Sequence, residues 1–390
     1  MNQTPSSERV HIAFFGRRNV GKSSLVNAFT GQTVAIVSDV KGTTTDPVSK
    51  AMELLPLGPV QIIDTPGLDD EGTLGQLRVQ STLKVLSTAD MAIVVTDATR
   101  PMQDDEAALL KAIRERGLPH LLVRNKADLP GVLPGEGILT STVTGQGIEE
   151  LKKQASALIP EGQECPLVAD LLSPGDTVVL VVPIDQSAPK GRLILPQQQT
   201  IRDILEAGAA ALVCRDTELS ATLSALNSPP KLVITDSQVF DKVNAIVPSD
   251  VPLTSFSILM ARYKAELPLL VKGLEGLKNL KDGDRILIAE GCTHHRQCED
   301  IGTVKLPRLL RRHTGIEPEF VFASGKDFPS DLKEYQLVIH CGGCMQTHRQ
   351  LQYRLNQCNL AGVPVTNYGL LFAYLNGILP RSVAPFGLKI

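Results

Sequence analysis

The 390-residue sequence contains no tryptophan, and only 4% of its residues are aromatic. Proteins that bind single-stranded nucleic acid stack its bases on aromatic side chains, so this scarcity argues against that class. A formal net charge of −3 gives no overall attraction to nucleic acid or to an anionic membrane. We therefore expect neither nucleic acid nor a membrane among the partners.

Long apolar runs are also absent. The longest, such as residues 178–184, are far shorter than the roughly 20 residues that cross a bilayer. The cysteine count of seven is odd, and no charged and apolar leader precedes the first expected strand at Val10. These absences argue against a secreted disulfide scaffold and predict a cytoplasmic location.

A phosphate-binding loop follows the first expected strand, residues 10–15. The loop reads GRRNVGKS over residues 16–23, and a helical pattern at 24–29 comes directly after it. In this context backbone amides surround phosphates, Lys22 reaches the β- and γ-phosphates, and the Ser23 hydroxyl binds Mg²⁺. The expected phosphate-binding residues are Gly16, Asn19, Gly21, Lys22, Ser23 and Ser24.

Two further motifs come in the order that a GTPase requires. The segment GTTTD, residues 42–46, is expected to be a switch in which Thr44 completes the Mg²⁺ coordination. The segment DTPG, residues 64–67, ends an expected strand, so Asp64 holds Mg²⁺ through water and the Gly67 amide senses the γ-phosphate. The expected catalytic residues are Lys22, Thr44 and Gly67.

A base-recognition motif, NKAD at residues 125–128, ends another expected strand. The Asp128 carboxylate can accept hydrogen bonds from N1 and N2 of guanine, and adenine lacks both donors. Ser141 and Thr142 are expected to support the guanine carbonyl, although Thr142 stands where alanine is usual. The sequence therefore predicts GTP as the nucleotide, recognised by Asn125, Lys126, Asp128, Ser141 and Thr142.

Together these motifs resemble the small bacterial GTPases of the tRNA-modifying and ribosome-assembly families. In that group an asparagine at the position of Asn19 often marks a potassium-dependent enzyme. The resemblance implies that Asn19 helps to hold K⁺ against the phosphates. A loop asparagine that hydrogen-bonds its own backbone is the alternative.

Strand and helix patterns alternate from residue 177 to residue 246, which predicts a small parallel sheet. We find no nucleotide loop and no group of metal ligands in this stretch. A sheet without chemistry of its own often joins subunits, so we hypothesise that this part of the chain forms a homodimer.

Candidate metal ligands follow two expected strands in the last part of the chain. The segment CTH, residues 292–294, follows a strand at 284–289, and HCGGC, residues 340–344, follows a strand at 335–339. Helical patterns come after them, at 303–312 and 347–355. Because the carboxyl ends of parallel strands share one edge, we expect both groups to meet there.

Those ligands suit two kinds of metal site. Three cysteines with one histidine form a tetrahedral zinc site, and three thiolates with an open position equally suit an iron–sulfur cluster. The candidate ligands are Cys292, His294, His340, Cys341 and Cys344.

A GTPase domain, a plain α/β domain and this Cys/His arrangement together resemble the FeFe-hydrogenase maturation GTPases of the HydF type. The resemblance spans the chain and implies that Cys292, Cys341 and Cys344 hold a 4Fe-4S cluster. The fourth iron position is then open or exchangeably filled, and its candidates are His294, His340, a carboxylate and water. The implied α/β fold has three domains: a P-loop GTPase domain (1–162), a dimerisation domain (163–266) and an iron–sulfur-cluster-binding domain (267–390).

The resemblance also implies a function. The protein would receive a diiron precursor from radical-SAM maturases and deliver it to apo-hydrogenase, with slow GTP hydrolysis as a regulatory timing step. One alternative is a zinc-containing GTPase acting in tRNA modification or ribosome assembly. Another alternative is a redox enzyme whose cluster passes electrons. A cluster closed by four cysteines would support that role, whereas three cysteines and a vacant iron position argue for binding another cluster or ligand.

Overall fold

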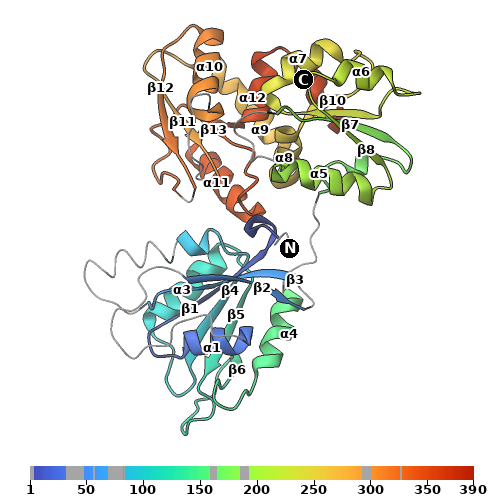
Figure 1. The fold of residues 1–390 in the computed structure, drawn as a ribbon. Coiled ribbons are helices and arrows are strands. Elements are labelled where there is room, and N and C mark those ends of the chain that lie inside the picture. Colours follow the sequence, from blue (N-terminus) through green and yellow to red (C-terminus); the bar gives the residue numbers. More distant parts are fainter. Residues whose placement is uncertain are drawn as a thin grey trace. The chain divides into compact units, whose positions relative to one another are not determined.

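The structure, a computed structural model, describes residues 4–31, 48–55, 58–68, 82, 84–158, 165–184, 193–291, 300–325 and 327–390. The chain forms two compact units, Met1–Gln163 and Glu164–Ile390 (Figure 1). No sheet and no hydrophobic cluster of the described residues is shared between the two units. Within the described residues, no helix combines the length and the apolar character needed to cross a membrane.

The described strands of the first unit form a six-stranded sheet in the order β2-β3-β1-β4-β5-β6. Only β2 runs antiparallel to its neighbour; the other pairs are parallel. The bounds are β1 Val10–Gly16, β2 Val48–Leu54, β3 Gly58–Asp64, β4 Met91–Asp97, β5 His120–Asn125, β6 Ile138–Leu139, α1 Lys22–Thr30, α3 Asp104–Glu115 and α4 Ile148–Leu158.

Alternation along β1 explains how this sheet is covered on both faces. Ile12 and Phe14 pack with residues of α1 and α4, whereas Ala13 and Phe15 point to the other face and pack with residues of α3. Because hydrophobic clusters cover both faces of the sheet, every residue of β4 is buried. Such a sandwich places all the parallel strands' carboxyl ends, and the loops that follow them, at one edge (Figure 1).

The second unit contains two four-stranded parallel sheets, ordered β10-β9-β7-β8 and β12-β11-β13-β14. The first includes β7 Thr177–Val181, α5 Leu195–Glu206, β8 Ala210–Cys214, α6 Leu219–Ser224, β9 Leu232–Thr235, α7 Phe240–Ile246, β10 Leu253–Ser255 and α8 Phe256–Lys264. The second includes α9 Leu267–Gly273, β11 Arg285–Ala289, α10 Leu306–Thr314, β12 Glu319–Ala323, β13 Leu337–His340, α11 His348–Ala361, β14 Val365–Asn367, α12 Tyr368–Leu375 and α13 Leu379–Val383.

Helix α8 joins these two sheets. Leu259 and Met260 pack with the core beside β7, whereas Ile258 and Ala261 belong to a cluster that continues into β11 and β13. An amphipathic surface helix would bury only one stripe, but α8 is buried on several sides. The two sheets therefore share a continuous core, and Figure 1 shows α8 between them.

The helices that follow the two candidate ligand groups differ from the expected ranges. The helix expected at 303–312 begins with a π-helical turn, Ile301–Lys305, before α10. In this turn the Lys305 N–H donates to the Asp300 carbonyl and the Leu306 N–H to the Ile301 carbonyl, each five residues back. The helix expected at 347–355 is longer, because α11 continues to Ala361 and ends at Gly362.

Candidate functional site

The described residues of the expected nucleotide site gather at the carboxyl edge of the first unit's sheet. They lie at the ends of β1, β3 and β5, in the segment after β6, and in the first turn of α1. They are Gly16, Asn19, Gly21, Lys22, Ser23, Ser24, Asp64, Gly67, Asn125, Lys126, Asp128, Ser141 and Thr142. Thr44 lies outside the described residues.

The phosphate loop is tied to the base-recognition motif. Asn125 Nδ2 donates a hydrogen bond to the Val20 carbonyl at 2.9 Å, and a Cβ at position 21 would lie 2.3 Å from the same nitrogen. Gly21 also has a φ of +84°, so only glycine fits there without strain. Asn19 adopts a left-handed φ of +59°, which asparagine tolerates better than most residues.

The three side chains expected to meet phosphate and Mg²⁺ contact one another. Lys22 Nζ donates to Asp64 Oδ1 at 2.6 Å and to the Thr65 carbonyl. Ser23 Oγ donates to Asp64 Oδ2 at 2.8 Å. An ammonium, a hydroxyl and a carboxylate are therefore held together where β3 ends and α1 begins, which is the donor set that a Mg²⁺-nucleotide requires.

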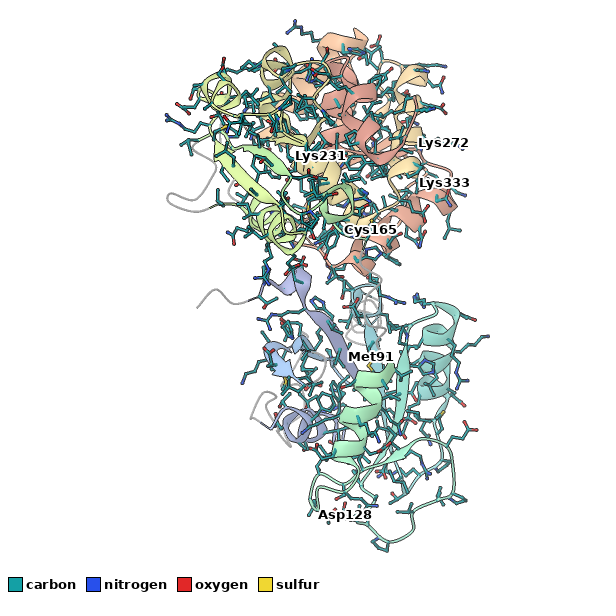
Figure 2. The ribbon with its side chains drawn as sticks, turned by 90° about the vertical axis from the view of Figure 1, so that its right-hand side faces the viewer. Met91, Asp128, Cys165, Lys231, Lys272 and Lys333 are labelled. Atoms are coloured by element: carbon teal, nitrogen blue, oxygen red, sulfur yellow. The ribbon has the colours of Figure 1, made fainter. Side chains whose placement is uncertain are left out.

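The base-recognition residues form a second group. Ser141 Oγ donates to Asp128 Oδ1 at 2.6 Å, and Lys126 Nζ donates to Asp97 Oδ2 at 2.8 Å. Burial opposes ionisation of Asp97, but hydrogen bonds from Lys126 and Thr99 outweigh it and hold the pKa of Asp97 below its usual value. Asp128 is exposed, and Figure 2 shows it at the tip of the unit, remote from Met91, where β4 begins.

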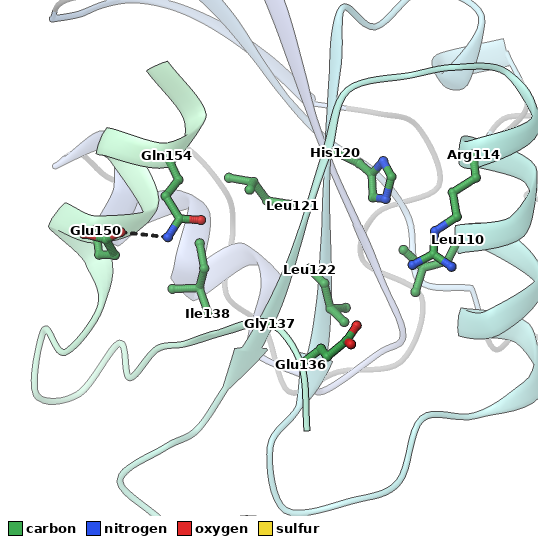
Figure 3. A pocket seen from close by; sticks show the side chains of 10 residues that line it. All are labelled: Leu110, Arg114, His120, Leu121, Leu122, Glu136, Gly137, Ile138, Glu150 and Gln154. Atoms are coloured by element: carbon green, nitrogen blue, oxygen red, sulfur yellow. Dashed lines mark hydrogen bonds between the residues drawn. The ribbon is translucent and has the colours of Figure 1, made fainter. Parts of the chain in front are cut away.

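A cavity of about 430 Å³ lies elsewhere on this unit. It is lined by His120 and its neighbours at the amino-terminal end of β5, with Arg114 of α3 on one side and Gln154 of α4 on the other (Figure 3). Gln154 Nε2 donates to Glu150 Oε1 at 2.7 Å. Because the guanine motif follows the opposite end of β5, this cavity is separate from the nucleotide site.

The described cysteines of the candidate metal site lie in the turn after β13. Cys341 Sγ accepts hydrogen bonds from the Gly291 N–H at 3.0 Å and the Gly343 N–H at 3.4 Å. Gly343 has a φ of +65°, which allows the chain to turn toward Cys344. Gly291 directly precedes Cys292, so the two strand ends do meet, but Cys292 and His294 lie outside the described residues.

His340 lies at the end of β13, and its ring is engaged on both sides. His340 Nδ1 is 2.8 Å from the Cys341 carbonyl, and Nε2 is 3.1 Å from an Arg354 guanidinium nitrogen. Arg354 also donates to the Gly325 carbonyl at 2.5 Å. Burial, and then the Arg354 charge, lower the pKa of His340 to about 3. The ring is therefore neutral, with its Nε2 lone pair directed at Arg354.

Burial and two backbone N–H groups act in opposite directions on the pKa of the Cys341 thiol. Burial raises the pKa of Cys341 to about 11, although the two backbone N–H donors oppose this shift. A metal cation favours loss of that proton, and N–H donors then stabilise the thiolate sulfur. Among the described residues, His, Cys, Asp and Glu do not form a group of three that could hold a metal ion.

Two buried cations near this turn were missed by the sequence analysis. Arg354 comes from α11, and Lys264 is the last residue of α8. Both are buried, with exposed fractions of 5% and 1%. In the sequence each stands in a helical pattern like many solvated basic residues, so no local signal distinguishes them.

Comparison with protein families gives a match for each part of the chain. The model described as "50S ribosome-binding GTPase" matches residues 11–126. "Hydrogen maturase F dimerization domain" matches residues 167–265, and "Hydrogen maturase F tetramerization domain" matches residues 268–385.

Curated relatives match the first unit only. The tRNA modification GTPase MnmE of Geobacter metallireducens is 39% identical over 152 residues, which is 37% of this chain and 33% of the relative. MnmE of Synechococcus sp. (strain JA-3-3Ab) is 38% identical over 165 residues, 40% of this chain and 35% of the relative. The chain thus spans about a third of the length of these relatives.

Among solved structures, the G domain of the T. maritima FeoB iron transporter is 29% identical, with a TM-score of 0.31. The match covers 38% of this chain and 99% of that chain.

Proposed function

The chain belongs to the hydrogen maturase F family, and we propose that it is a GTP-hydrolysing scaffold that holds a 4Fe-4S cluster and delivers a diiron precursor to apo-hydrogenase. One observation carries the proposal. The turn that contains Cys341 and Cys344 is hydrogen-bonded to Gly291, the residue before Cys292, in a chain that also has a GTPase domain.

The nucleotide half of this function rests on the contacts at the end of β3. We assign Lys22 to the β- and γ-phosphates, Ser23 and Thr44 to Mg²⁺, and the Gly67 amide to the γ-phosphate. Asp64, which accepts from Lys22 and Ser23, would hold Mg²⁺ through water. When the nucleotide binds, Lys22 exchanges the Asp64 carboxylate for phosphate oxygens.

Guanine recognition and potassium binding complete the nucleotide site. Asp128 would accept from the guanine edge, while Ser141, which donates to Asp128 at 2.6 Å, keeps that carboxylate oriented. Asn125 links the motif to the phosphate loop through Val20. We further propose that Asn19, whose left-handed backbone lies in the loop itself, helps to hold K⁺ beside the phosphates.

Replacing Asp128 with Asn should weaken GTP binding on the order of 10- to 100-fold, because a charged acceptor is lost. Binding of xanthosine triphosphate should strengthen, since the Asn amide can accept from N1–H and donate to the carbonyl that replaces the N2 amino group. Titration calorimetry with both nucleotides measures the two affinities. Equal affinity of the variant and the wild type for GTP would show that Asp128 does not read the base.

The donor set of the second unit fits an iron–sulfur cluster. Sulfur ligands bind iron, and the two backbone N–H groups aimed at Cys341 Sγ are the donors that stabilise cluster sulfurs. We propose that Cys292, Cys341 and Cys344 hold the cluster. When bound, such a cluster supplies an iron with a coordination position that a cargo or exchangeable ligand can take.

Of the two contested histidines, we propose that His340 supports the site without binding metal. Its Nε2 is occupied by Arg354 and its Nδ1 by the Cys341 carbonyl. A ligand role would require it to give up one of these contacts inside a fully packed interior. His294, a carboxylate and water remain the candidates for the fourth position.

His340→Gln should therefore keep its iron and its EPR spectrum, while the free energy of unfolding falls by about 1–3 kcal/mol as the buried contacts are disturbed. Iron analysis and low-temperature EPR of the reconstituted variant measure the first effect, and chemical denaturation measures the second. Loss of iron from a folded His340→Gln protein would identify His340 as a ligand.

The family matches support an oligomeric protein, because they include a dimerization and a tetramerization domain. We propose that the expected boundaries, 1–162, 163–266 and 267–390, separate the GTPase, dimerisation and cluster-binding parts. The first part has relatives named for tRNA modification, but they match only that part.

For the whole chain we propose radical-SAM maturases and apo-hydrogenase as partners, because the dimerization and tetramerization models that match the second unit are both named for hydrogen maturase F.

An activation assay tests the carrier role. Protein purified anaerobically from cells that also make the radical-SAM maturases is mixed with apo-hydrogenase, and hydrogen evolution is followed. The proposal requires activation by this protein and none by protein made without the maturases. Absence of activation by a preparation that contains its cluster would rule out delivery of the precursor.

A further inference from the structure

The side chain of Lys264 is buried against the turn formed by residues 341–344, which we call the cysteine turn. Its ammonium Nζ donates to the carbonyl of Gln346 at 2.8 Å, and it lies 3.4 Å from the carbonyl of Cys344 and 3.5 Å from that of Gly343. Only 1% of the residue is exposed to solvent. One cation thus contacts three carbonyls of the segment after Cys341, those of residues 343, 344 and 346.

These contacts fix the orientation of the peptide groups in the turn. In a planar trans peptide the N–H points opposite to the C=O. Because the Gly343 and Cys344 carbonyls face Lys264, the amide N–H groups of the next residues point away from Lys264. These are the N–H groups of Cys344 and Met345, and N–H groups that point to one side of a turn favour an anion on that side. The Gly343 N–H already reaches Cys341 Sγ.

Lys264 reaches the turn from a different part of the sequence. It ends α8, which belongs to the segment matched by the dimerization-domain model, whereas the turn belongs to the segment matched by the tetramerization-domain model. The start of α8 is fixed as well. Ser257 Oγ accepts from the Gly369 N–H at 3.1 Å, and Asn367 Nδ2 donates to the Ser257 carbonyl at 2.9 Å. Both ends of α8 are therefore attached to the second sheet.

A second buried cation, Arg354, contacts His340, the residue before Cys341. Moving a charged side chain out of water costs free energy unless a group of opposite charge or a set of hydrogen bonds offsets the loss. The carbonyls of residues 343, 344 and 346 supply such hydrogen bonds to Lys264. A 4Fe-4S cluster with three thiolate ligands carries net negative charge, so a positive charge on the other side of the turn would attract it.

We propose that Lys264 is a positioning residue for the cluster: it fixes the Cys341–Cys344 turn through the carbonyls of residues 343, 344 and 346, and it places a buried positive charge beside the bound anionic cluster. This inference rests on the proposed cluster site. A nearby positive charge stabilises the reduced, more negative cluster more than the oxidised one, so Lys264 raises the reduction potential.

The test uses the full-length reconstituted protein and an EPR-monitored redox titration. Lys264→Met, which removes the charge and the hydrogen bonds, should shift the reduction potential to a more negative value. Lys264→Gln removes the charge and keeps an N–H donor on a shorter side chain, so the potential should shift in the same direction. Lys264→Arg should stay near the wild type. Unchanged potentials in both the Met and the Gln variants would overturn the inference.

A matched control is Lys272→Met, which removes an exposed lysine of the same unit and should leave the potential unchanged (Figure 2).

Iron and sulfide analysis distinguishes a failure of the proposed function from a failure of this inference alone. If the wild type binds no cluster, the proposed function fails. If the wild type binds one and the Lys264 variants titrate as it does, only the inference fails. Loss of iron from a Lys264→Met protein with unchanged circular dichroism supports the positioning role, and Lys264→Gln carries the test if Lys264→Met does not fold.

Discussion

Replacing Lys22 with Ala is expected to reduce GTP turnover on the order of 10²- to 10³-fold or more, because a charge placed at the phosphates is lost. Lys22 Nζ is buried at the start of α1 and contacts Asp64 at 2.6 Å, where the nucleotide phosphates are expected. The iron and sulfide content should not change, since the cysteine turn belongs to the other compact unit. Phosphate release and iron analysis on the same preparation measure both effects.

The matched control is Lys111→Ala, which removes a lysine of the same unit whose side chain is 79% exposed. It should leave turnover within about twofold of the wild type, as surface substitutions usually do. Loss of the cluster absorbance in Lys22→Ala would contradict the assignment of separate sites. Full turnover in Lys22→Ala would contradict the role of the phosphate loop itself.

The second large effect is expected for Cys344→Ser. Because iron–sulfur clusters are held by thiolates and a serine hydroxyl is a much poorer ligand, the variant should lose most of its iron and its ability to activate apo-hydrogenase. GTP hydrolysis should persist, since the Lys22, Ser23 and Asp64 contacts are untouched. Iron analysis, the activation assay and phosphate release measure these three properties.

Cys214→Ser is the matched control, because Cys214 is a half-buried cysteine of the same unit that lies in β8, in the other sheet. It should keep both iron and activation. A Cys344→Ser protein that retains a full cluster would show that Cys344 is not a ligand. Loss of iron from the Cys214 variant as well would indicate that any cysteine change disturbs the fold.

The sequence predicted that the nucleotide motifs follow strands of one parallel sheet, because each motif is local. Each of the motifs beginning at Gly16, Asp64 and Asn125 marks the end of a strand, and the rule that parallel strands end at one edge brings them together. The close approach of Asn125 to Gly21 is not visible in the sequence, since it depends on how β1 and β5 are placed around β4.

The second unit was predicted less completely. The rule that parallel strands end at one edge correctly predicted that the segments at Gly291 and Cys341 meet. It did not predict Lys264 and Arg354, which contact this turn and its neighbour His340 from helices. Lys264 is about 80 residues from the carbonyls that it contacts, and Arg354 reaches His340 from the next helix. A lysine on a helix usually faces solvent, so its burial follows from α8 packing between two sheets, which no local pattern encodes.

The most direct test of the account is low-temperature EPR of the anaerobically reconstituted and reduced protein, with iron, zinc and acid-labile sulfide measured on the same sample. The account predicts the spectrum of one reduced 4Fe-4S cluster per chain, with about four irons and four sulfides, in the wild type and not in Cys344→Ser. A colourless, EPR-silent protein with one zinc and no sulfide would contradict it.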